Sequence, residues 1–185
     1  PNYISKYTKT APSSIQVCGW RSKFRVLKNM KTIKILSLLF VVLLVSSCKQ
    51  NDWLDWKAQN ELWLVQNAQR DSIQTSPTGL QYKCIYAGYD KSARPDDTKV
   101  VTIKYSGKLI NGYQFDAADS YVSYVSNFVP GFREGLKKMR EFGIYEFYIP
   151  YNLGYGINGS GTEGTSSHIP PYSTLIFRVE LQGVN

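Results

Sequence analysis

The side chains of this sequence that could support chemistry are mainly aromatic, and they gather around the stretch Val101–Asp116, which reads VTIKYSGKLINGYQFD. Its first residues alternate between apolar and polar, with the period of two that is typical of a half-buried strand. An Asn-Gly pair at 111–112 indicates a turn, after which a second run returns beside the first. The resulting ribbon would bring Tyr105, Phe115 and Asp116 near one another at one end. Aromatic side chains with a few hydrogen-bonding groups among them typically line an apolar binding pocket.

Metal-dependent chemistry finds no support in the spacing of candidate ligands. His168 is the single histidine, and no cluster of Cys, Asp or Glu accompanies it. We interpret it as a polar loop residue. The three cysteines, Cys18, Cys48 and Cys84, have neither zinc nor redox spacing. Cys84 lies in an apparent strand, where we expect a small buried thiol.

Three later segments give the hairpin its meaning: Val129–Phe132 (VPGF), Leu153–Gly156 (LGYG) and Ile169–Phe177 (IPPYSTLIF). Together with the hairpin, in this order and at this spacing, they resemble the FKBP-type peptidyl-prolyl cis-trans isomerases. The resemblance covers roughly Thr78–Val184. It implies an enzyme that needs no metal or cofactor, whose partners are proline-containing polypeptide segments and whose further ligands are macrolide inhibitors of the FKBP class.

The reaction that this resemblance implies has modest chemical requirements. An Xaa–Pro amide rotates over a barrier of roughly 18–20 kcal/mol because its resonance must be broken. Uncatalysed isomerisation therefore takes on the order of tens to hundreds of seconds. The twisted transition state loses the resonance dipole, so a dry apolar pocket should favour it over the planar substrate. Such a preference for the transition state is what accelerates the step.

The resemblance also assigns roles to individual residues. The catalytic residues would be Tyr105, Phe115, Asp116, Tyr155 and Phe177. The substrate-binding residues would be Phe128, Val129, Phe132, His168 and Ile169. The Tyr155 hydroxyl and the Val129 backbone N–H would each donate to a substrate carbonyl, while Asp116 would accept from the Tyr105 hydroxyl at the rim and order the pocket. Asp116 is not expected to act as a general base, since no proton is transferred.

Each of these residues also has a structural interpretation. Phe132 and Phe177 could simply be core residues, Tyr105 a hydrogen-bonded strand residue, and Asp116 a turn cap. The chain also departs from the family pattern: Phe132 stands where many members have Trp, and the stretch between Asp116 and Phe128 is short, with Tyr121 or Tyr124 as the substitute for an expected aromatic. The shortened stretch favours a rival function, a non-catalytic FKBP-like binding module or holdase chaperone on the membrane surface, whereas Phe115, Tyr155 and Phe177 together favour catalysis.

Hydrophobic periodicity predicts the elements that position these residues. We expect strands over Leu80–Tyr86, Val100–Phe115, Tyr121–Phe128, Ile144–Pro150 and Ser173–Leu181. Pro130 suits the first position of a helix that runs to about Glu141, and a long glycine-rich loop follows at 151–171. The fold class is therefore α+β, an antiparallel twisted sheet wrapped around one α-helix, as in the FKBP-like fold.

A helical segment is expected before this domain, over Asp52–Arg70. Apolar residues recur there at helical spacing, with three tryptophans on or near one face. The segment either packs on its own domain or forms a partner or dimer surface. Because all tryptophans after residue 48 lie in it and none lies in the pocket motifs, we expect residues 49–76 to be separable from the isomerase domain.

The first part of the chain resembles an export signal. Met30 opens a segment in which Lys31 and Lys34 precede an apolar run of eleven residues, too short to span a bilayer. The sequence Ser46-Ser47-Cys48 that follows looks like a bacterial lipobox, which implies lipidation of Cys48, a membrane partner and a lipid-anchored, extracytoplasmic location in the cell envelope. An ordinary signal peptide, or a basic organelle transit peptide, is the alternative.

This leader completes the expected domain organisation. Residues 1–29 are expected to be a non-native upstream extension, 30–47 a lipoprotein signal peptide, 48–77 the lipidated cysteine, Trp-rich helix and linker, and 78–185 the FKBP-type isomerase domain.

The net charge of +8 belongs to the leader and not to the domain. Residues 1–47 contain eight of the 22 basic residues and no acidic residue, so 14 basic and 14 acidic residues remain in 48–185. A neutral domain without basic clusters has no electrostatic reason to bind nucleic acid.

Overall fold

The computed structural model describes residues 52–185 of the chain. The expected signal peptide and Cys48 lie outside the described residues. Within the described part, no helix has the length and apolar character needed to cross a membrane. The elements, in chain order, are α2 (Asp52–Asn67), β1 (Gln74–Thr75), β2 (Gln81–Tyr86), β3 (Val100–Lys108), β4 (Gln114–Tyr124), η1 (Val125–Asn127), α3 (Pro130–Leu136), β5 (Ile144–Ile149), η2 (Tyr151–Leu153) and β6 (Leu175–Val184).

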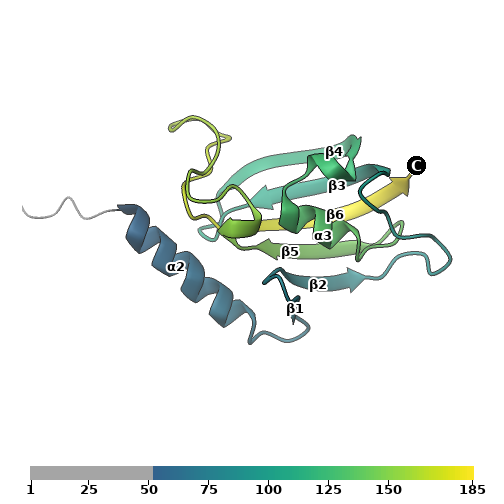
Figure 1. The fold of residues 1–185 in the computed structure, drawn as a ribbon, viewed down its shortest axis with the longest axis horizontal. Helices are drawn as coiled ribbons and strands as arrows, with labels where there is room; N and C mark the ends of the chain where they lie inside the picture. Colours follow the sequence, from purple (N-terminus) through teal and green to yellow (C-terminus); the bar gives the residue numbers. More distant parts are fainter. Residues whose placement is uncertain (1–51) are drawn as a thin grey trace, which may run out of the picture. The chain divides into compact units, whose positions relative to one another are not determined.

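The strands form one six-stranded sheet in the order β1-β2-β5-β6-β3-β4, in which all neighbouring pairs are antiparallel. β6 therefore lies inside the sheet between β5 and β3, and α3 packs on one face of it (Figure 1). This architecture confirms the α+β expectation, with a second helix, α2, ahead of the sheet.

The core follows the alternation that the sequence predicted. Leu175, Phe177, Val179 and Leu181 of β6 point to the same face and are buried, as are Val101 and Ile103 of β3. Phe147 and Ile149 of β5 join them with no exposed surface. Strands with this period of two have one face against the core and one toward solvent.

α3 begins at Pro130 as expected, but it ends at Leu136 and not near Glu141. After Leu136 the backbone switches to bonds between residues three apart, Lys138 N–H to Gly135 and Met139 N–H to Leu136. Met139 is nevertheless fully buried. The apolar spacing that predicted a helix to about Glu141 therefore comes from a tighter turn that packs on the core. Gly135 lets α3 approach the sheet, since a Cβ there would lie 2.6 Å from the Phe147 ring.

Other boundaries also differ from the prediction. The strand expected over 121–128 starts much earlier, because β4 continues from the hairpin turn to Tyr124 and then gives way to η1. The expected linker 72–78 contains the short strand β1. β1 pairs only with Gln81 and Tyr82, so the rest of β2 is a sheet edge. Cys84 on that edge is exposed, and the expectation of a buried thiol is wrong.

α2 confirms the predicted helix and packs on its own domain. Three side chains of its inner face make hydrogen bonds to the domain: Trp56 to Ser173, Asn60 to Thr174, and Asn67 to Gln81. Trp63 adds an aromatic contact to Tyr148, with ring centroids 5.7 Å apart.

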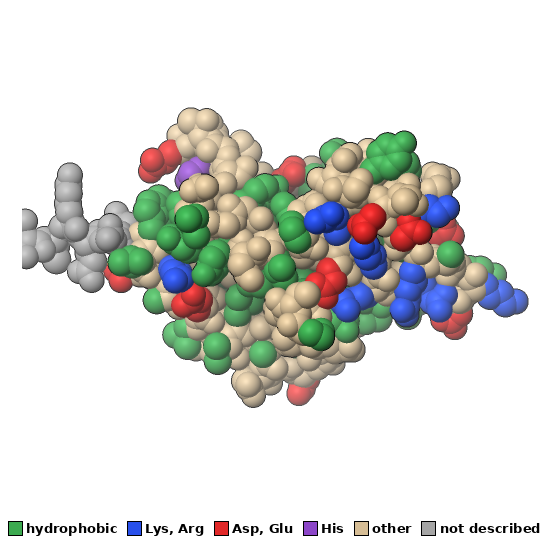
Figure 2. All heavy atoms as spheres, in the orientation of Figure 1, with side chains coloured by type: hydrophobic (Ala, Val, Ile, Leu, Met, Phe, Trp, Pro, Cys, Tyr) green, Lys and Arg blue, Asp and Glu red, His purple; other side chains and the backbone are tan. Residues whose placement is uncertain are grey.

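On the face shown in Figure 2, basic and acidic side chains are interspersed, in keeping with the balanced charge of residues 48–185.

Candidate functional site

A cavity of about 540 Å³ opens where β3, β4, β6, the start of α3 and the loop after η2 meet. Its lining residues are Tyr105, Asp116, Ala117, Ala118, Tyr121, Asn127, Phe128, Val129, Phe132, Tyr155 and Phe177. Six of these eleven side chains are aromatic, so the cavity is an apolar pocket with a small number of polar groups.

Phe132 forms the floor of the cavity from the first turn of α3. Only 2% of its surface is exposed. Its ring stacks on Phe128 at 4.7 Å between centroids and meets Phe177 edge-on at 4.9 Å. Phe147 supports it from the core side at 5.6 Å. Edge-to-face and offset contacts of this kind fix ring orientation beyond simple burial.

Tyr105 and Asp116 form the polar side of the pocket, on the hairpin of β3 and β4. The Tyr105 hydroxyl donates to Asp116 Oδ2 at 2.7 Å. Burial, followed by this hydrogen bond, raises the pKa of Tyr105 well above its usual value. The hydroxyl therefore keeps its proton at neutral pH, and its bond to the carboxylate orders the rim.

Tyr155 lies on the long loop, where its side chain is 40% exposed. Burial, and next the charge of Asp116, raise the pKa of Tyr155. The backbone is fixed on both sides of Tyr155, because the N–H groups of Gly154 and Gly156 donate to the Tyr151 carbonyl and the Gly156 carbonyl accepts from Tyr172 N–H. Gly156 has φ +69°, a left-handed conformation that glycine adopts without strain. The neutral hydroxyl is thus presented at the cavity as a potential donor.

Seven of the sequence-predicted site residues line the cavity together: Tyr105, Asp116, Phe128, Val129, Phe132, Tyr155 and Phe177. Phe115, His168 and Ile169 do not. Phe115 is buried behind Phe177, with ring centroids 5.5 Å apart at 87°, so it supports a wall without forming one. Ile169 belongs to the core and its backbone pairs with Ser160. His168 lies in the same loop beyond the lining.

Tyr121 lines the cavity, whereas the other candidate for the missing aromatic, Tyr124, does not. The Tyr121 ring lies edge-on to Tyr105 at 5.9 Å and to Phe128 at 6.1 Å. Ala117, Ala118 and Asn127 were not identified from the sequence as lining residues. Small residues and an Asn carry no signal of their own; β4 places the two alanines at the pocket, and η1 places Asn127 there.

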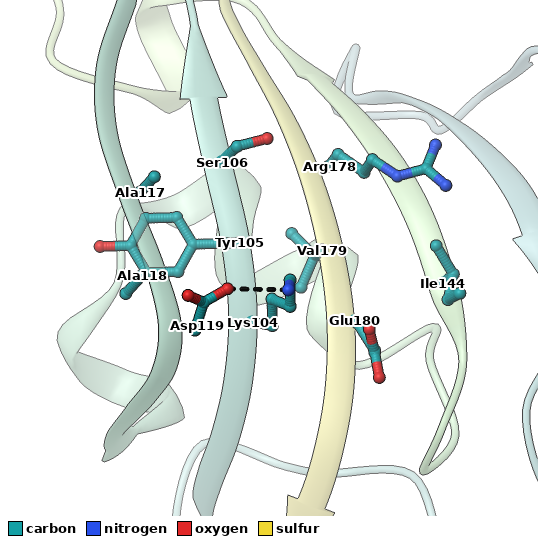
Figure 3. Close-up of a pocket in the computed structure, with 10 residues that line it drawn as sticks. All are labelled: Lys104, Tyr105, Ser106, Ala117, Ala118, Asp119, Ile144, Arg178, Val179 and Glu180. Atoms are coloured by element: carbon teal, nitrogen blue, oxygen red, sulfur yellow. Dashed lines mark ion pairs between the residues drawn. The ribbon is translucent and has the colours of Figure 1, made fainter.

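A second hollow, of about 360 Å³, lies across β3, β4 and β6 and shares Tyr105, Ala117 and Ala118 with the first cavity (Figure 3). Lys104 pairs there with Asp119 at 2.7 Å, and Arg178 pairs with Glu146 at 3.3 Å. The hydrogen bond from Lys104, and then its charge, lower the pKa of Asp119. Because both cations already have acidic partners, this hollow has the character of a solvated outer sheet face.

Residues 91–182 match the family described as FKBP-type peptidyl-prolyl cis-trans isomerase. The probable FKBP-type isomerase FkpA of Neisseria meningitidis is 38% identical over 129 residues, which are 68% of this chain and 45% of that protein. The outer membrane protein MIP of Legionella longbeachae is 35% identical over 132 residues, 69% of this chain and 54% of that protein.

The crystal structure of FkpA from Escherichia coli is similar in fold, with a TM-score of 0.67 and 31% identity. The match covers 85% of this chain and 73% of that chain. The chain spans about half the length of the curated relatives named above.

Proposed function

Because the chain belongs to the FKBP-type peptidyl-prolyl cis-trans isomerases, we propose that it catalyses cis–trans isomerisation of Xaa–Pro bonds in extended or partly unfolded polypeptides outside the cytoplasm. The observation that carries this proposal is the aromatic cavity in which the Tyr155 hydroxyl and the Tyr105–Asp116 pair supply the polar groups. Macrolide inhibitors of the FKBP class would compete for the same cavity.

The mechanism relies on solvent exclusion and orientation. The proline ring would lie on Phe132, between Phe177 and the Tyr105 side of the pocket, where no water competes for the amide. As the amide twists, its nitrogen becomes pyramidal and its carbonyl loses resonance, which the apolar surroundings favour. Donors preorganised for the twisted geometry lower the barrier further. Tyr155 would bind one substrate carbonyl, and the Val129 N–H, just before the first turn of α3, another.

NMR exchange spectroscopy with the full chain and a short Xaa–Pro peptide tests this function directly. Catalysis would appear as cis–trans exchange faster than in the peptide alone. The rival function, a non-catalytic binding module or holdase, predicts peptide line broadening or chemical-shift changes while the isomerisation rate stays at the uncatalysed value. That second result with a folded chain would reject the isomerase proposal.

Tyr155→Phe is expected to slow turnover by about two- to tenfold. The substitution removes one neutral hydrogen bond, worth about 0.5–1.5 kcal/mol, and about 1.4 kcal/mol corresponds to a tenfold change in rate. Exchange spectroscopy gives the rate, with Tyr124→Phe as the matched control because Tyr124 is exposed and lies outside the cavity. Equal rates for both variants and the unchanged chain would mean that the Tyr155 hydroxyl does not contact a substrate carbonyl in the transition state.

The location is proposed from the leader and from the similar protein that is named an outer membrane protein. The apolar run followed by Ser46-Ser47-Cys48 supports lipidation of Cys48 and removal of the preceding residues. Stable anchoring would require more than one acyl chain, since a single chain binds membranes only marginally.

Cys48→Ser is expected to release the protein from membranes or to leave it unprocessed. Fractionation of cells followed by mass spectrometry of the N-terminal peptide measures both effects. Cys84→Ser is the control, because that thiol is exposed on a sheet edge and far along the chain from the leader. An unmodified, internal Cys48 in membrane-derived protein would contradict the lipid anchor.

A further inference from the structure

The loop that carries Tyr155 returns to the sheet through residues 170–174, and this return segment lies against α2. We infer that Asn60 of α2 is a positioning residue for Tyr155, acting through the backbone of the loop, with Trp56 as its partner. The inference rests on the proposed function only for its effect on turnover, because the structural link can be measured without any assay of activity.

Asn60 is an unusual residue for the inner face of a helix. It has no exposed surface, and both ends of its amide are satisfied. Its Oδ1 accepts from the Thr174 N–H at 2.7 Å, and its Nδ2 donates to the Trp56 carbonyl at 2.8 Å. A buried amide of this kind is costly unless every partner is present. Asn60 therefore fixes the position of the Thr174 backbone against α2.

Trp56 and Lys57 hold the residues just before Thr174. The Trp56 indole N–H donates to Ser173 Oγ at 3.0 Å, and that hydroxyl donates in turn to the Pro170 carbonyl at 2.7 Å. The Lys57 ammonium lies 5.4 Å from the centre of the Tyr172 ring, within the range of a cation–π contact. One turn of α2 thus binds three consecutive residues of the loop.

Hydrogen bonds connect the loop residues held by α2 to the backbone next to Tyr155. Tyr172 N–H donates to the Gly156 carbonyl at 3.0 Å, and Gly156 N–H donates to Tyr151 at 2.8 Å. The Tyr151 and Tyr172 rings also meet edge-on at 5.3 Å. Tyr172 has φ +60°, a conformation that a non-glycine residue keeps only when its surroundings enforce it. The contacts of α2 with the Tyr172 ring and with the next two residues, Ser173 and Thr174, supply that enforcement.

The consequence is that α2 takes part in the geometry of the pocket while remaining outside its lining. A looser loop would leave the Tyr155 hydroxyl at the cavity but less often aligned with its substrate carbonyl in the transition state. The loss would therefore fall on turnover more than on substrate affinity, as for an interaction made mainly in the transition state. This differs from the sequence-based expectation that residues 49–76 are separable from the isomerase domain.

Asn60→Ala in the full chain tests the inference, with Asn67→Ala as a matched control. Asn67 lies two turns further along the same helix face and is also buried, but its side chain bonds to Gln81 and not to the loop. We expect Asn60→Ala to lower kcat about three- to tenfold with little change in KM, and to speed amide hydrogen exchange at Gly156 and Tyr172. Asn67→Ala should leave both quantities unchanged.

Trp56→Phe provides a second variant should Asn60→Ala fold poorly, since it removes the indole donor and leaves a smaller aromatic ring against the core. It should speed exchange at Tyr172 and lower kcat about two- to threefold. Unchanged exchange at Gly156 and Tyr172 in both variants would overturn the inference, as would equal losses of kcat in Asn60→Ala and Asn67→Ala. If the unaltered chain proved inactive, the isomerase proposal would fail, while the exchange measurements would still decide whether α2 positions the loop.

Discussion

Gly107→Ala is expected to reduce isomerase activity by about tenfold or more, which corresponds to about 1.4 kcal/mol or more in the barrier. Gly107 is buried in β3 between two aromatic rings. A Cβ at this position would lie 2.7 Å from atoms of both the Phe115 and the Phe177 rings. Real Cβ contacts are not that short, so both rings would have to move, and Phe177 forms a wall of the cavity.

The same substitution should also destabilise the fold by about 1–3 kcal/mol, the usual cost of overpacking a core. The backbone of Gly107 does not have a positive φ, so the effect comes from the added methyl group alone. Gly183→Ala in β6 is the control, since a Cβ there would meet no atom within 4 Å. Exchange spectroscopy and urea unfolding of the two variants measure both effects, and wild-type rates for Gly107→Ala would show that the two rings do not shape the pocket.

Phe132→Ala is expected to lower the free energy of unfolding by about 3–5 kcal/mol, the range typical of Phe→Ala in a core. Four aromatic rings contact Phe132, and three of them (Tyr105, Phe128 and Phe177) line the cavity. Truncation would remove the floor of the cavity and admit water beside the amide, so activity should fall even under conditions in which the variant is folded.

Urea denaturation followed by circular dichroism measures the loss of stability. Phe142→Ala is the matched control, because that ring is 57% exposed and the same truncation there should change stability by less than about 0.5 kcal/mol. A small loss of stability for Phe132→Ala would mean that the neighbouring rings move into the vacated space. That result would contradict the role of Phe132 as a fixed floor of the cavity.

Much of the frame that carries the site could be predicted from the sequence, because burial on one face imposes a period of two on strands. β3, β5 and β6 were predicted on this basis, and the start of α3 was predicted from Pro130, which suits the first helical turn. The hairpin turn at Asn111-Gly112 also has the expected position, with Gly112 at φ +85°. These are local signals, because each depends on the types and spacing of a few residues close together in the chain.

The features that were missed depend on partners distant in the chain. The apolar spacing up to Met139 is compatible with either a helix or a tighter turn, and only packing decides between them. Phe115 and Phe177 both point inward, but nothing in their own segments tells which ring faces the cavity. Asn60 occupies a helical position among tryptophans, and its polar partner lies 114 residues away, in the return of the loop. Periodicity can identify the buried face of α2 but not the backbone amide that it binds.

The place of β6 in the sheet has a consequence for the order of events during synthesis. β6 pairs with β5 on one side and with β3 on the other, so the two halves of the sheet share no hydrogen bonds until Leu175–Val184 has emerged. Closing the sheet requires pairings between residues far apart in the chain, from Lys108 with Ile176 to Val101 with Val184, and non-local pairing of this kind slows folding. In a nascent chain, the β3–β4 half and the β1–β2–β5 half of the sheet would therefore stay unpaired with each other until β6 is made.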